Sequence, residues 1–334
     1  MNSNPSRTSP DPTRQLYFPV AEGVWGTKDV FVNMYFVRSG TEANRWVLID
    51  AGLKTSGTRI KKIAAELFGA ESKPDAIIMT HGHFDHVGSL KKLAEEWDVP
   101  VYAHYLEMPY LTGRSSYPPP DPWVGGGLMA SLSWMYPKSP VDLGSRVEIL
   151  PEDMSVPFMP GWKWVHTPGH SPGHVSFWRE SDRTLIAGDA FVTTKNESVW
   201  SVMKQEPYVS GPPKYFTTDW RAAEASVAKL AALSPETAAT GHGRPLKGHW
   251  MTEALQGLSS RFVDLAVPKQ GRYVVEPAIA DAGGTRYVPP QDPAVRKTQM
   301  RYAVVGASML AIAAMTLLFL NRGDSDSEMD TPEM

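Results

Sequence analysis

The chain has 334 residues, of which 42% are hydrophobic and none is cysteine. The missing cysteines exclude disulfides, thiolate metal sites and a cysteine nucleophile, so His, Asp or Glu must hold any metal. The formal net charge is −3 and the basic residues are dispersed, which argues against a nucleic-acid partner. Residues 1–15 are polar and proline-rich, and we expect a disordered lead there rather than a secretory signal.

The first half of the chain predicts alternating strands and helices. We expect strands at residues 30–39, 45–52, 75–80 and 99–104, and helices at 56–69 and 87–97. Ser56 marks the start of the first of these helices and Gly69 its end. Residues 114–140, "RSSYPPPDPWVGGGLMASLSWMYPKSP", form a long insert that is rich in Pro, Gly, Trp and Met. A loop of this length is usually functional or disordered, and its apolar residues argue for packing, with a short helix within 128–136.

The second half repeats the strand-then-helix pattern. Strands are expected at residues 146–150, 162–167, 174–179, 183–190 and 237–243, and helices at 219–233 and 249–267. Residues 271–277 and 285–293 resemble the strands of a hairpin. We therefore expect one globular domain over residues 16–267, built of two β-rich halves with helices outside, and an extension and linker over 268–301.

Residues 302–320, "YAVVGASMLAIAAMTLLFL", carry no charge over 19 positions. A helix of that length is about 28 Å long, close to the hydrocarbon thickness of a bilayer. We expect a C-terminal transmembrane helix, because a buried core helix would show an amphipathic period. Arg296, Lys297 and Arg301 precede the segment, and the acidic tail 321–334 follows it. The positive-inside rule then predicts a single-pass membrane protein with its globular domain in the cytoplasm.

The segment "IIMTHGHFDHVGSL", residues 77–90, holds three of the nine histidines of the chain. His81 and His83 share a face of an extended segment, because side chains at i and i+2 point the same way. Asp85 and His86 follow where the chain turns into a helix, and they can face a second place. One metal cannot readily use all four side chains from so short a loop, which favours two metals.

Further candidate ligands follow other predicted strands. The segment "HTPGHSPGH" holds His166, His170 and His174, Asp189 lies in "LIAGDA" at the end of a strand, and His242 ends "AATGH". Loops at one edge of a sheet converge, and metal sites are commonly built there. Each of these residues alone fits a turn or a cap, but together with the histidine loop they predict a metal site.

These motifs, in this order, resemble the metallo-β-lactamase superfamily over about residues 20–267. The resemblance implies an α/β fold, the αββα metallo-β-lactamase sandwich, to which the chain would add its one C-terminal transmembrane helix. It implies two metal groups joined by a bridging Asp189: His81, His83 and His170 for the first metal, and Asp85, His86 and His242 for the second. It also implies that Asp50 orients a ligand histidine, and we place His174 behind the ligands rather than among them.

The resemblance further implies two Zn²⁺ ions, with iron and manganese as alternatives. A hydroxide that bridges the metals would attack the substrate, and Asp85 or a metal-bound water would protonate the leaving group. The chain is similar to a little-characterised hydrolase branch near the glyoxalase II and lactonase types, which predicts an ester, lactone or thioester substrate. An iron-dependent oxidoreductase, similar to persulfide dioxygenases, is the alternative, and a non-catalytic binding module is a third reading.

We expect the substrate contacts to lie in the apolar insert and in the segment after Asp189. The candidates are Trp123, Trp134, Lys204, Tyr208 and Tyr215. An apolar lid over the metals predicts a small, uncharged or lipophilic substrate. The insert can also serve as ordinary core packing, or lie against the membrane, and the sequence leaves the oligomeric state open.

Overall fold

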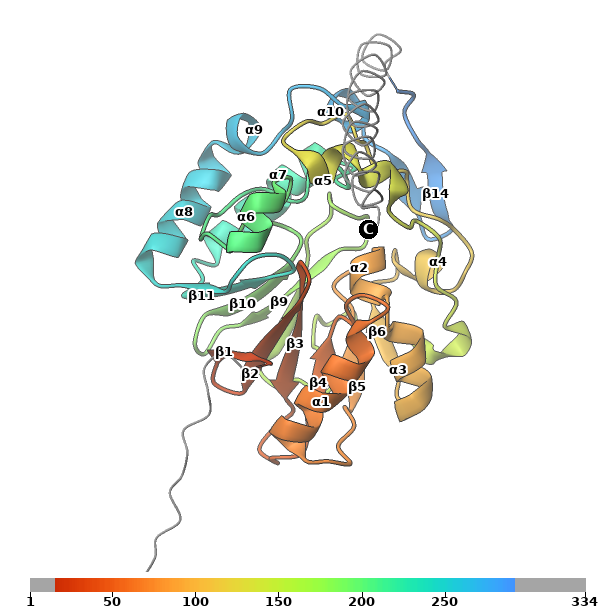
Figure 1. Ribbon diagram of the computed structural model, residues 1–334, viewed down its shortest axis with the longest axis vertical. Helices are drawn as coiled ribbons and strands as arrows, with labels where there is room; N and C mark the ends of the chain where they lie inside the picture. The colour runs from red at the N-terminus through yellow and green to blue at the C-terminus, as the bar shows by residue number, and fades with distance from the viewer. Residues whose placement is uncertain (1–15, 292–334) are drawn as a thin grey trace, which may run out of the picture. The chain divides into compact units, whose positions relative to one another are not determined.

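A computed structural model describes residues 16–291, and in it two β-sheets lie face to face with helices on their outer faces (Figure 1). The larger sheet has seven strands that pair in chain order. They are β1 (Phe18–Ala21), β2 (Val24–Asp29), β3 (Val32–Arg38), β4 (Trp46–Ile49), β5 (Ala76–Ile78), β6 (Val101–Ala103) and β7 (Val147–Ile149). The strands β1 to β4 pair antiparallel, and β4 to β7 pair parallel.

The smaller sheet has five strands in the order β12-β11-β10-β9-β8. They are β8 (Trp162–His166), β9 (Val175–Arg179), β10 (Thr184–Gly188), β11 (Thr237–Thr240) and β12 (Leu246–Lys247). Only β10 and β11 pair parallel, with Gly188 opposite Thr240, so the residues that follow both strands leave the sheet at the same edge. A separate hairpin joins β13 (Ile279–Asp281) to β14 (Gly284–Tyr287).

Helices cover the outside of both sheets. Those in the first half are α1 (Ser56–Phe68), α2 (Phe84–Val87), α3 (Leu90–Trp97) and α4 (Met108–Leu111). The insert forms α5 (Leu128–Ser131) and the 3₁₀ turn Ser133–Met135, and a second 3₁₀ turn, Gly144–Arg146, precedes β7. The later helices are α6 (Val199–Lys204), α7 (Trp220–Ala232), α8 (His249–Ser260), α9 (Phe262–Leu265) and α10 (Arg272–Val275).

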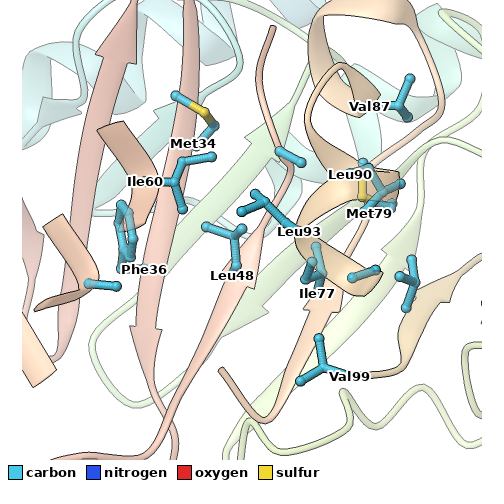
Figure 2. Packing of buried hydrophobic residues seen from close by; sticks show 14 of the residues in the cluster. Met34, Phe36, Leu48, Ile60, Ile77, Met79, Val87, Leu90, Leu93 and Val99 are labelled. Carbon is cyan, nitrogen blue, oxygen red and sulfur yellow. The ribbon is translucent and has the colours of Figure 1, made fainter. Parts of the chain in front are cut away.

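Apolar side chains alternate between the two faces of the strands and form three apolar layers. On β3, Met34 and Phe36 pack toward α1 and α3 (Figure 2), whereas Tyr35 and Val37 pack between the sheets. This is the period-two pattern of a strand that is buried on both faces. On β10, Ile186 joins the layer between the sheets, and its neighbours join a third layer against α7 and α8. The αββα sandwich expected from the sequence is therefore present.

Two predicted elements differ from the structure, and one hairpin of the larger sheet was missed. The strand expected at 271–277 is instead helix α10, because its buried Tyr273 donates its hydroxyl to the carbonyl of Pro119 and Asp121 accepts the N–H of Arg272. Tertiary contacts thus override the β preference of its valines. The helix expected over 249–267 breaks at Arg261, which has the non-helical angles φ −129° and ψ 32°. The β1–β2 hairpin was not predicted, because its glycines and charged residues hide the strand pattern.

The membrane predictions are corrected. No helix within residues 16–291 is long and apolar enough to cross a membrane. The segment expected to span the bilayer, 302–320, lies outside the described residues, as do the lead 1–15 and the tail 321–334. The fold class that the structure shows is the sandwich, and the described residues give no support to the predicted transmembrane helix or to the localisation inferred from it. The compact unit that holds the sandwich extends to Pro289 and thus includes the β13–β14 hairpin.

Candidate metal centre

The turn after β5 and the short helix α2 together carry four of the candidate ligands. His83 has an extended backbone, with φ −67° and ψ 155°, directly before α2. His81 points the same way as His83, whereas Asp85 and His86 lie within α2 and point elsewhere. Each pair is completed by a histidine from a distant loop, which gives two groups: His81, His83 and His170, and Asp85, His86 and His242. A third group, His81, His86 and Asp189, links them. Within each group, the atoms that could bind a metal lie within 4.8 Å of one another.

Asp189 stands between the two groups, directly after β10. Its Oδ2 atom lies 3.4 Å from Nε2 of His170 and 3.0 Å from Nε2 of His242. Because these histidines belong to different groups, the carboxylate of Asp189 lies against both groups. All seven candidate ligands are buried.

Three buried polar atoms at the centre have no hydrogen-bond partner among the described residues. They are Nε2 of His81, Nε2 of His86 and Oδ1 of Asp189. A buried polar atom without a partner costs about 1–3 kcal/mol, so such atoms in one cluster need an explanation. Nitrogen and carboxylate oxygen are ligands for divalent zinc, iron and manganese. The residues present therefore fit a divalent metal ion, and the identity of the metal is left open.

Hydrogen bonds to neighbouring groups determine which imidazole nitrogen of His86 and His242 faces the candidate metal site. Nδ1 of His86 lies 2.8 Å from Oδ2 of Asp50, and Nδ1 of His242 lies 2.9 Å from the carbonyl of Phe31. Each Nδ1–H donates to that oxygen, which leaves Nε2 free to bind a cation. Asp50 also accepts the N–H and the hydroxyl of Thr80, so it is held on both oxygens.

The electrostatics of the metal-free cluster suit metal binding. Burial and the neighbouring imidazoles lower the pKa of His81 well below its ordinary value, and burial lowers the pKa of His83 to about 3. Burial would raise the pKa of Asp189, but His242 and His86 hold it well below the ordinary range. The imidazoles of the first group are therefore neutral and Asp189 is ionised, as metal ligation requires. In the second group burial alone would lower the pKa of His86 and His242, but the neighbouring carboxylates raise it, so these imidazoles would release a proton when a metal binds.

Gly241 lets the backbone before His242 approach Asp189. A Cβ atom at this position would lie 2.0 Å from Oδ1 of Asp189 and 2.9 Å from Cε1 of His86. No side chain fits there. The glycine before this histidine is therefore required for close approach and not for an unusual backbone angle.

Aromatic rings surround the candidate ligands. Phe216 stacks on His83 with ring centroids 4.7 Å apart, and Phe31 stacks on His242 at 6.0 Å. Phe84 stacks on Tyr136 of the insert at 5.4 Å. The three phenylalanines were missed in the sequence, although Phe84 lies inside "HGHFDH", because single aromatic residues in loops carry no periodic signal.

The structure brings only one of the five candidate substrate residues to this aromatic cluster. Tyr215 is buried against Tyr136 and Phe216. Trp134 is exposed (68%), Lys204 lies over the ring of Trp200, and Tyr208 lies under Lys195. Trp123 is half-buried beside Asp121. Within residues 16–291, no hydrogen bond, ion pair or ring contact joins these last four side chains to the seven candidate ligands.

The chain is similar to known proteins over most of its described length. Residues 27–242 match the family model of the metallo-beta-lactamase superfamily. The Bacillus subtilis (strain 168) protein named probable metallo-hydrolase YflN is 46% identical over 244 residues, which cover 73% of this chain and 92% of that protein.

Two solved structures are also similar. TTHA1623, crystallised in a di-iron-bound form, is 28% identical with a TM-score of 0.46, over 71% of this chain and 96% of its own. A B3 metallo-beta-lactamase with an active-site glutamic acid is 14% identical with a TM-score of 0.50, over 76% of this chain and 88% of its own. At that identity the second likeness concerns the fold alone.

Proposed function

The chain belongs to the metallo-beta-lactamase superfamily and is a metal-dependent hydrolase, and from this premise we propose that it cleaves an ester, lactone or thioester with two metal ions. The observation that carries the proposal is the pair of buried three-residue groups that share Asp189. A single ion cannot use both groups, whereas two ions on either side of one carboxylate can. We assign His81, His83 and His170 to the first ion and Asp85, His86 and His242 to the second.

Two bound divalent cations would supply an activated water and would polarise the scissile carbonyl. The protein's part is to hold the ligands, to keep bulk water away and to move a proton. Asp189 fixes the spacing between the two groups, because one carboxylate oxygen reaches a histidine of each. Asp85 lies 3.5 Å from Nε2 of His242, and we assign it to the second ion and to proton delivery onto the leaving group. No serine or cysteine nucleophile is needed.

The aromatic rings favour an apolar acyl group. Phe31, Phe84 and Tyr136 are only half-buried, so part of each ring faces solvent beside the candidate ligands. Ring surfaces bind apolar groups and give no partner for a negative charge. We therefore propose a small acyl substrate with an uncharged or lipophilic body, and no nucleic-acid substrate.

The test is proton release by the purified, metal-loaded full chain. Lactones, aryl esters, thioesters and phosphodiesters are supplied one at a time with an indicator dye, because hydrolysis of an acyl bond frees an acid. Release from at least one acyl class, absent in Asp189→Ala, supports the proposal. Release from phosphodiesters alone, or from nothing while two metals are bound, would overturn the proposed bond class.

A further inference from the structure

We propose that Glu107 is a positioning residue that joins the two loops of the first metal group and holds them in register. Glu107 is completely buried, directly before α4. Its Oε2 accepts the backbone N–H of Gly82 at 3.0 Å, and its Oε1 accepts the backbone N–H of Gly173 at 2.8 Å. Gly82 lies between His81 and His83, and Gly173 follows His170 in the other loop. One carboxylate therefore spans the two loops that supply this group.

The carboxylate of Glu107 is fully engaged. Besides the two backbone N–H groups, it accepts the hydroxyl of Ser171 at 2.8 Å and the hydroxyl of Tyr117. An ionised carboxylate only accepts hydrogen bonds, and here each oxygen receives two donors. An amide of the same shape would turn an N–H₂ group toward two of these donors. The arrangement thus depends on the carboxylate and not merely on a buried side chain of that size.

Gly82 and Gly173 lie so close to Tyr117 and Glu107 that no side chain would fit at either position. A Cβ atom on Gly82 would lie 2.7 Å from the hydroxyl oxygen of Tyr117. A Cβ atom on Gly173 would lie 2.8 Å from the backbone nitrogen and from Cγ of Glu107. Approaches this short do not occur for real side chains, so the two loops come this close to Glu107 only as glycine. This gives a reason for glycine in both "HGH" and "HSPGH".

Tyr117 extends the support to a ligand ring. Its hydroxyl also lies 2.9 Å from the N–H of Gly82, and its ring packs on His83 with centroids 4.5 Å apart. The same ring stacks on the ring of Tyr110 with centroids 3.8 Å apart. Tyr117 lies within the insert, so the insert takes part in holding the first metal group.

Glu107 acts through these loops and not on a substrate, since all four of its donors belong to the protein. The inference rests on the proposed metal centre and not on the proposed bond class. Removing the carboxylate should therefore lower the affinity for one of the two metal ions, the one held by His81, His83 and His170. The equivalent held by Asp85, His86 and His242 should change little.

The experiment measures two dissociation constants for Zn²⁺ on the metal-free full chain, by competition with a chromophoric chelator. For Glu107→Gln we expect one constant to rise about tenfold or more and the other to stay within about threefold, which is the range found for groups that orient metal ligands. Tyr110→Phe is the matched control. It removes the phenol hydroxyl of the ring that stacks on Tyr117. That hydroxyl contacts Thr285 and neither ligand loop, so both constants should match the wild type.

A lower melting temperature with both constants unchanged would overturn the inference, because Glu107 would then be only a structural residue. If Glu107→Gln does not fold, Tyr117→Phe keeps the ring and removes one donor to the carboxylate. We expect a smaller rise in the same single constant, and unchanged constants would again overturn the inference. Failure of the wild type to bind zinc would remove the metal centre as well. Zinc binding without acyl hydrolysis would refute only the proposed bond class.

Discussion

The Nε2 atom of His174 accepts a hydrogen bond from the backbone N–H of Asp189 at 2.8 Å. The other ring nitrogen lies 2.8 Å from the hydroxyl of Thr167, to which it donates. Both nitrogens of His174 are therefore engaged, and the residue is in none of the three groups placed to bind a metal. His174 lies behind Asp189 and holds its backbone in place.

Replacing His174 by Phe should weaken metal binding without removing a metal. We expect two metals per chain at saturation, with affinity lowered about tenfold, because the ring volume remains and only the support of Asp189 is lost. Elemental analysis and chelator competition measure the two quantities. His249→Phe is the control, since His249 is a highly exposed histidine on α8. A loss of one full metal equivalent in His174→Phe would identify the residue as a ligand instead.

Adding one methyl group at Gly241 should disrupt the centre without changing a ligand. In Gly241→Ala the new Cβ would overlap Oδ1 of Asp189, so we expect less than one metal per chain and an activity loss of about a hundredfold or more. Gly257→Ala is the matched control on α8, where a Cβ meets nothing within 4 Å. It should keep both metals and raise the free energy of unfolding by about 0.5–1 kcal/mol. Normal metal content in Gly241→Ala would contradict the described approach.

The aromatic rings should select the length of the acyl group. In Tyr136→Ala, we expect kcat/KM for a long-chain aryl ester to fall about tenfold while that for the acetyl ester stays unchanged, because only the long chain reaches the removed ring. Trp134→Ala should alter neither value, since that ring is exposed and lies apart from the ligands. Equal losses for both esters in Tyr136→Ala would show that the ring supports the centre and does not bind the acyl chain.

The seven candidate ligands could be predicted from sequence because their motifs resemble those of a known family and because most of them lie in short segments of simple local geometry. His81 and His83 share a face of extended chain, Asp85 follows on a helix, and Asp189 and His242 end neighbouring parallel strands. Such relations depend on spacing and on strand ends, both of which the sequence displays. The other strands of the two sheets could be predicted in the same way, but the β1–β2 hairpin and the two-residue β12 could not.

The supporting residues could not be found by such reasoning. Glu107 meets Gly82 and Gly173 from 25 and 66 positions away, and no local pattern marks a single buried glutamate. The helix α10 was read as a strand because its partner Asp121 is 151 positions distant. Among the substrate candidates, the exposed Trp134 shows that an aromatic residue in an apolar insert need not face the site.

Acid should destabilise the metal-free protein partly through His104. Burial, and then the charge of His166, lower the pKa of His104 to about 3, and the two rings stack with centroids 4.2 Å apart. Trp164 and Tyr105 also face this imidazole, and the backbone N–H of Leu106 donates to it. The unfolded chain takes up the proton first, so stability that is present above pH 6.5 is lost as the pH falls from about 6.5 toward 3.

His104→Asn keeps an acceptor for the Leu106 N–H and removes this titration. Urea unfolding of the metal-free protein at several pH values measures the effect. Between about pH 7 and pH 5, the wild type should lose about 2 kcal/mol more unfolding free energy than the variant. Parallel pH profiles for the two proteins would contradict the assignment.

The most direct test of the two-metal account is a zinc titration of the metal-free full chain, followed by proton release from the best acyl substrate. The account predicts that activity appears as zinc is added, reaches its plateau at two equivalents per chain, and is absent in Asp189→Ala at every zinc concentration. A plateau at one equivalent, or acyl hydrolysis that persists in Asp189→Ala, would contradict a centre in which Asp189 joins two metal ions.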